Sequence, residues 1–213
     1  MKKLFFVLMV AGGLMYCSIG RADITSVSCQ DDGDGVISCG PYMWSGSITS
    51  VTMDGTQHTV PGQTAAGHIL GDITTDSTTD PTLTLDSAIN NDTGYAWTAY
   101  DVNVYMDNPF SLSSASVTLP PDWTLASIQP TAVPVVSPHG SYEASMVFAS
   151  GTPVAIGDDL DFGYTISFTG STDYSFTQEM IPVPEPGTIG FLAAGVLLLG
   201  GLVVVRQRRN RLS

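Results

Sequence analysis

The sequence predicts an all-β protein, in which an antiparallel β-sandwich, either Ig-like or a jelly roll, spans residues 23–180. First, short runs of this region alternate apolar and polar residues with a period of two, as strands with one buried face do. Second, Gly, Pro, Asn and Asp interrupt the region at short intervals. Third, an uncharged apolar run near each end predicts a signal peptide over 1–22 and a single transmembrane helix over 188–205.

The N-terminal segment has the three parts of a secretory signal peptide. Lys2 and Lys3 form the positive start, and residues 4–15 form an apolar run that is short for a membrane span. Gly20 and Ala22 place small residues three and one before a cut after Ala22. We therefore expect residues 1–22 to be removed on export.

Two cysteines remain after this cut, because Cys17 leaves with the signal peptide. Cys29 and Cys39 flank a turn rich in Asp and Gly. An even cysteine count in an exported chain favours a hairpin closed by a Cys29–Cys39 disulfide, with two free thiols as the alternative.

The same turn carries a candidate calcium site. Asp31, Asp32 and Asp34 precede Gly35, which resembles part of an oxygen-rich calcium loop. The EF-hand pattern fails, because its twelfth position is Pro41 where a Glu is required. Calcium is thus an expected ligand of this turn, and solvated turn carboxylates are the alternative.

Large aromatic residues are the candidate ligand-binding groups of the middle region. Trp44, Trp97 and Trp123 each lie near a turn, where an exposed ring would stack on a sugar. The alternative is that they fill the core of the sandwich.

Strands follow from alternation. Residues 160–168 place five apolar side chains on one face, and residues 100–106 repeat the pattern. Shorter candidates are 51–53, 83–85, 117–119, 146–148 and 174–176. Turn signals such as Asn91-Asp92-Thr93-Gly94 separate these runs, as in a two-sheet sandwich.

No known catalytic motif is present. The sequence has no G-x-S-x-G, no H-E-x-x-H, no P-loop and no dinucleotide-binding glycine pattern. His58, His68 and His139 are dispersed, and we expect each at the surface or in a turn. These observations predict a non-enzymatic protein without catalytic residues.

The charges are segregated along the chain. Of the 213 residues, 7 are Lys or Arg and 20 are Asp or Glu, and every basic residue lies before 22 or after 205. A nucleic-acid partner is excluded for the acidic middle, because phosphate binding needs cations.

The C-terminal segment has three consecutive parts. Pro184, Glu185 and Pro186 lie in a Pro-rich linker over 181–187, and the uncharged run 188–205 is long enough to span a membrane. The Arg cluster in 206–213 predicts a cytoplasmic stop-transfer tail, formed by Arg206, Arg208, Arg209 and Arg211.

This order of Pro-Glu-Pro, short apolar helix and Arg cluster resembles the PEP-CTERM sorting signal. The resemblance implies an exosortase-type processing enzyme as partner and a precursor held in the inner membrane of a Gram-negative bacterium through residues 188–205. It further implies release at the cell surface or outside the cell, as a matrix or biofilm component. A carbohydrate-binding module for extracellular polysaccharide is the alternative function.

Overall fold

The structure is a computed structural model that describes residues 22–43, 49–58 and 66–185. The predicted signal peptide (except Ala22), the transmembrane helix over 188–205 and the tail with Arg206, Arg208, Arg209 and Arg211 lie outside the described residues. Trp44 and Pro186 also lie outside them. Within the described residues, no helix is long and apolar enough to cross a membrane.

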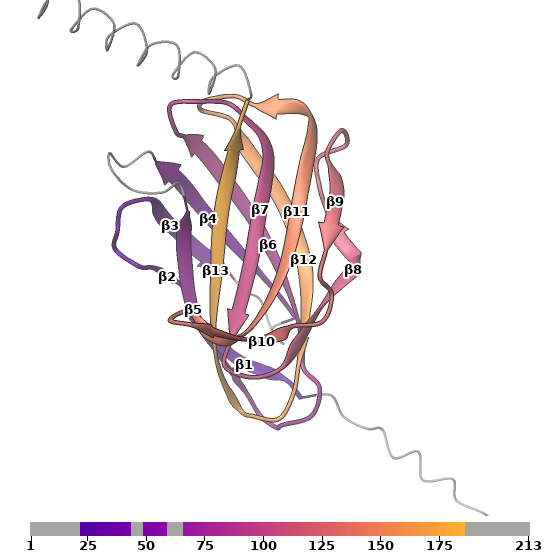
Figure 1. Ribbon diagram of the computed structural model, residues 1–213. Helices are drawn as coiled ribbons and strands as arrows, with labels where there is room; N and C mark the ends of the chain where they lie inside the picture. The colour runs from indigo at the N-terminus through magenta and orange to yellow at the C-terminus, as the bar shows by residue number, and fades with distance from the viewer. Residues whose placement is uncertain (1–21, 44–48, 59–65, 186–213) are drawn as a thin grey trace, which may run out of the picture.

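The described part of the chain is all-β and forms two sheets (Figure 1). An eight-stranded large sheet has the order β1-β5-β13-β7-β11-β10, with β2 paired to β5 and β9 paired to β11. A five-stranded small sheet has the order β3-β4-β6-β12-β8. The strands are β1 (Ile24–Val27), β2 (Gln30–Asp31), β3 (Ile37–Met43), β4 (Ser50–His58), β5 (Gly67–Thr75), β6 (Thr82–Asp92), β7 (Trp97–Met106), β8 (Phe110–Thr118), β9 (Thr124–Ile128), β10 (Val133–Ser137), β11 (Gly140–Val154), β12 (Asp159–Phe168) and β13 (Asp173–Pro184).

The two strongest strand predictions are confirmed. Residues 160–168 lie in β12 and residues 100–106 in β7. In β12 the apolar members of the alternation are buried, while Asp159 and Asp161 are exposed. The period of two thus marks strands that have one face in the core.

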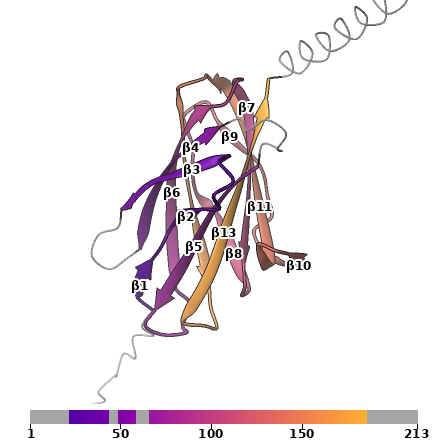
Figure 2. The ribbon, with the colours of Figure 1, turned by 90° about the vertical axis from the view of Figure 1, so that its left-hand side faces the viewer.

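The two sheets pack face to face over one core (Figures 1 and 2). Tyr100 and Phe148 of the large sheet contact Phe162 of the small sheet, with ring centroids 5.8 and 5.3 Å apart. Tyr100 also donates a hydrogen bond of 2.6 Å to Oε1 of the buried Gln57 on the small sheet. Aromatic packing and a buried hydrogen bond therefore join the sheets.

One strand pair departs from the predicted antiparallel arrangement. β4 and β6 run parallel, from Ser50 opposite Thr84 to His58 opposite Asp92. The chain between them crosses to the large sheet, where it forms β5, and then returns. Parallel neighbours cannot be joined by a short hairpin and need a long crossover connection. The passage through β5 provides it.

The last strand extends beyond the predicted domain boundary at residue 180. β13 pairs with β5 only as far as Met180, but its pairing with β7 continues to Pro184 opposite Trp97. Among the described residues, the strand after Met180 pairs on one side only, and prolines are tolerated at such an edge. Residues 181–184 are therefore strand and not linker.

Candidate functional site

The turn between β2 and β3 is shaped by its own carboxylates. Backbone amides donate to these side chains two residues earlier: Gly33 N to Asp31 Oδ1 (3.2 Å), Asp34 N to Asp32 Oδ1 (3.1 Å) and Val36 N to Asp34 Oδ1 (2.7 Å). Gly33 and Gly35 both have a φ of 78°, which only glycine adopts readily. The turn thus fixes Asp32 and Asp34, and each keeps its second oxygen for another partner.

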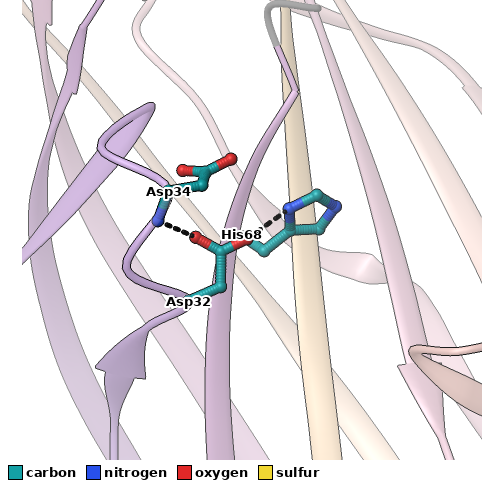
Figure 3. Close-up of side chains that lie close together, drawn as sticks. All are labelled: Asp32, Asp34 and His68. Carbon is teal, nitrogen blue, oxygen red and sulfur yellow. Dashed lines mark hydrogen bonds and ion pairs between the residues drawn. The ribbon is translucent and has the colours of Figure 1, made fainter. Parts of the chain in front are cut away.

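That second oxygen of Asp32 meets a histidine from the large sheet (Figure 3). His68 of β5 places Nδ1 3.0 Å from Asp32 Oδ2. One ligand atom from each of Asp32, Asp34 and His68 lies within 4.8 Å of the others. Two residues of the turn and one of a distant strand therefore converge on a common point.

The far side of the His68 ring is also held. Its Nε2 lies 3.4 Å from Glu179 Oε1 on β13, while Glu179 Oε2 accepts hydrogen bonds from Asn103 Nδ2 (2.7 Å) and Tyr105 Oη (3.2 Å). The ion pair with His68 lowers the pKa of Glu179 to about 2, and the same contact raises the pKa of His68. Glu179 is thus a carboxylate anion at neutral pH that orients the imidazole.

A second histidine covers this ring. His139 stacks on His68 with centroids 4.4 Å apart and an interplanar angle of 17°. His68 is only 14% exposed as a result of these neighbours, which come from the turn, β13 and the β10–β11 turn. His68 thus lies half-buried on the outward face of β5, so it is not a turn residue, and the expected surface position holds in part.

The predicted calcium residues divide into two groups. Asp32 and Asp34 join the cluster, whereas Asp31 does not, because its oxygens accept from Gly33 N and from Cys39 N (3.4 Å). His68 escaped the sequence prediction, since no spacing relates it to the turn. The one signal in the sequence was His68 itself, a polar residue within the otherwise apolar segment 67–71.

The structure does not support the hairpin predicted for the cysteines. β2 pairs with β5 in the large sheet and β3 with β4 in the small sheet, so Cys29 and Cys39 flank a connection between sheets. Both are free thiols in the structure. A hydrogen bond to Cys39 and burial raise the pKa of Cys29, whose Sγ lies 2.8 Å from Met53 Sδ. The disulfide stays a prediction, now one between sheets.

The two described tryptophans belong to the core. Trp97 is 0% and Trp123 6% exposed. Their indole nitrogens donate to Thr93 Oγ1 (3.0 Å) and to the Thr152 carbonyl (3.2 Å). Neither ring offers a face for sugar stacking, so the predicted ligand-binding role of Trp97 and Trp123 is wrong.

The strand end that precedes the Arg-rich tail is fastened to the fold. Glu185 N donates to the Ala96 carbonyl (3.1 Å), and Thr98 Oγ1 donates to the Pro184 carbonyl (3.4 Å). Pro184, the first residue of the Pro-Glu-Pro sequence, is therefore the last residue of β13, and Glu185 follows it directly without an intervening spacer.

Comparison with known families places a sorting signal at this end of the chain. Residues 182–209 match the PEP-CTERM protein-sorting motif. Comparisons with curated proteins and with solved structures each found no significant match. The motif implies export and handling by an exosortase. The chain is therefore a protein that carries a PEP-CTERM sorting motif, as the order of Pro184, Glu185, Pro186, apolar run and Arg cluster predicted.

Proposed function

We propose that this chain is an exported, non-enzymatic structural protein whose β domain becomes a component of the extracellular polysaccharide matrix. The observation that carries the proposal is the sorting motif over 182–209. A sorting signal assigns a destination outside the cytoplasm, and a sandwich packed on one apolar core suits a load-bearing component there.

The delivery route follows the order of segments. In the proposed precursor, residues 1–22 direct export, residues 188–205 hold the chain in the inner membrane of a Gram-negative bacterium, and the Arg-rich end stays in the cytoplasm. An exosortase-type enzyme then reads Pro184, Glu185 and Pro186. Because β13 runs up to Pro184, the enzyme meets its substrate next to the folded domain.

Intact mass spectrometry of the protein from its native host tests this route. We expect a mature mass that lacks residues 1–22 and the chain beyond about residue 186. A full-length tail in the inner membrane would contradict the proposal and leave a simple membrane anchor.

The motif itself is tested by Glu185→Ala. The substitution keeps the backbone hydrogen bond to Ala96, so the end of β13 should stay paired. We expect the uncleaved precursor to accumulate, whereas Glu143→Ala on β11 should mature normally. Normal maturation of both variants would show that the glutamate is not read.

A second candidate function is binding of the polysaccharide itself. With Trp97 and Trp123 buried, the feature that favours it is a cavity of about 430 Å³ on the small sheet, lined in part by Asp86, Asp161 and Pro120. Carboxylates and a pyrrolidine ring are suitable partners for sugar hydroxyls and apolar sugar faces. Retardation in gels that contain the host polysaccharide, lost in Asp86→Asn with Asp161→Asn, would support this function.

A further inference from the structure

We propose that Asp32, Asp34 and His68 form a binding site for a divalent transition-metal ion, with zinc as the best-suited ion. The proposal is independent of the sorting signal and of any matrix role. It replaces the calcium site expected from the turn alone, because the third ligand comes from β5.

The first argument is convergence from separate parts of the chain. Asp32 and Asp34 belong to one turn, and His68 lies on a strand that begins at Gly67. Their ligand atoms lie within 4.8 Å of one another. In a tetrahedral zinc site with bonds of about 2.0–2.2 Å, the ligand atoms lie about 3.3–3.6 Å apart, so the three side chains must move toward one another by up to about 1 Å to close the site.

The three side chains provide the ligand atoms that zinc prefers. One oxygen of Asp32 and one of Asp34 accepts a hydrogen bond from a backbone amide, which fixes each carboxylate, and the second oxygen of Asp32 lies 3.0 Å from His68 Nδ1. Two carboxylate oxygens and one imidazole nitrogen form a three-ligand set that suits zinc, with water in the fourth position. Calcium requires roughly six to eight oxygen ligands, and imidazole is not among its preferred groups.

Glu179, which is not a ligand, lies behind the His68 ring and orients it. Metal-binding histidines nearly always point their other ring nitrogen at a carboxylate or carbonyl, which orients the ring. The buried Nε2 of His68 lies 3.4 Å from Glu179 Oε1, within ion-pair distance but without a hydrogen bond, so a small approach of the two groups would complete this arrangement. Glu179 is itself held by Asn103 and Tyr105. This arrangement leaves Nδ1 as the nitrogen that faces Asp32 and Asp34.

The rest of the ring's surroundings limit its movement. His139 stacks on one face of His68, and the side chains of His68 and Asp32 are only 14% and 25% exposed. A partly enclosed site whose side chains are already restrained loses little conformational entropy when the ion binds.

The protein contains a matched control in His58. Its Nδ1 lies 2.8 Å from Asp92 Oδ2, so the pair has the same two groups at a similar distance. Its side chains are 35% and 64% exposed. Among the described residues, only Asp32, Asp34 and His68 bring three candidate ligand groups together. We therefore expect zinc at His68 and none at His58.

Isothermal titration calorimetry with zinc chloride on the full-length, chelator-treated protein in detergent tests the site. We expect one zinc ion per chain, at least a tenfold loss of affinity in His68→Gln and in Asp34→Asn, and no change in His58→Gln. Circular dichroism of each variant checks that the sheets are intact. Glu179→Gln should weaken binding roughly tenfold, because it orients the ligand without contacting the ion.

Cobalt provides a second measurement that a structural effect would not produce. Co²⁺ in a tetrahedral site of nitrogen and oxygen ligands absorbs visible light, and zinc should abolish the absorption while millimolar calcium should not. The proposal is overturned if the folded wild-type protein binds no zinc at millimolar concentration. It is also overturned if folded His68→Gln binds zinc as tightly as wild type.

Discussion

Two histidine–aspartate pairs of this protein join the same atoms, Nδ1 and Oδ2, at similar distances but differ in exposure and in their surroundings. His58 and Asp92 are 2.8 Å apart, and His68 and Asp32 are 3.0 Å apart. The shorter pair is the more exposed, and it joins directly opposed residues of the parallel strands β4 and β6. The longer pair fastens a turn to the large sheet and has Glu179 behind it. A short contact alone therefore does not identify a site; convergence and enclosure do.

The largest difference in stability between the two regions should appear when a glycine three residues from each histidine, on the same strand, is replaced by alanine. A Cβ at Gly71, three residues after His68, would overlap the Phe176 ring and the backbone oxygen of Ser28. Ser28 N also donates to the Asp72 carbonyl (2.9 Å), so the segment that leads to the turn rests on this part of β5. We expect Gly71→Ala to lower the free energy of unfolding by at least about 3 kcal/mol in urea denaturation.

The matched variant is Gly55→Ala, three residues before His58. A Cβ there would lie 3.2 Å from Ile89 Cδ1 and from the Ser38 carbonyl oxygen, which requires only a small shift. Its expected loss is about 1 kcal/mol or less. Equal losses in the two variants would show that β5 is not the more tightly packed support.

The next largest effect should come from oxidation of the two thiols, which should stabilise the His68 region and leave the His58 pair unaffected. Cys29 and Cys39 lie on either side of the turn that carries Asp32 and Asp34. In this turn the chain crosses from the large sheet to the small sheet. A disulfide across a loop of this length adds about 2–3 kcal/mol in the loop-entropy treatment. Urea denaturation of the oxidised protein, with and without reductant, measures this gain.

The paired substitution Cys29→Ser with Cys39→Ser serves as the control, because its stability should not respond to reductant. Intact mass spectrometry of protein taken from the cell exterior distinguishes the two states. A mass that corresponds to two reduced thiols would refute the disulfide.

The strands predicted over their greatest length are those whose inward positions all carry large apolar side chains. β12 and β7 are of this kind, and alternation alone revealed them. β5 escaped, because two of its buried positions are Gly67 and Gly71, which leave space for Ile37 of β3 in the facing sheet and for Phe176 of the adjacent β13. A hydrophobic pattern cannot register an inward residue without a side chain.

The candidate site was predictable only in its local half. Asp32 and Asp34 belong to a turn whose Asp-Gly composition is visible in the sequence. His68 and Glu179 reach it through the pairing of β5 with β2 and with β13, and that pairing depends on the whole fold. Likewise, the position of Trp97 near a turn left a surface position and a core position open, and its burial follows from the packing of the sheets.

The smallest predicted effect compares the two histidines in the absence of metal. His68 lies between two carboxylates, with side chains 14% exposed for His68 and 18% for Glu179. His68→Gln removes the hydrogen bond to Asp32 and the ion pair with Glu179. A partly buried group that loses a hydrogen bond costs about 1–2 kcal/mol. His58→Gln removes an exposed pair and should cost less than about 0.5 kcal/mol.

Urea denaturation of both variants in excess chelator measures this difference. Adding Glu179→Gln to each variant isolates its cause: the loss should be less than additive with His68→Gln, because the two residues interact, and additive with His58→Gln, because those two do not. Additive losses in both cases would mean that Glu179 acts on stability independently of the imidazole. The orientation of His68, and with it the comparison between the two pairs, would then have to rest on Asp32 and the stacked ring of His139 alone.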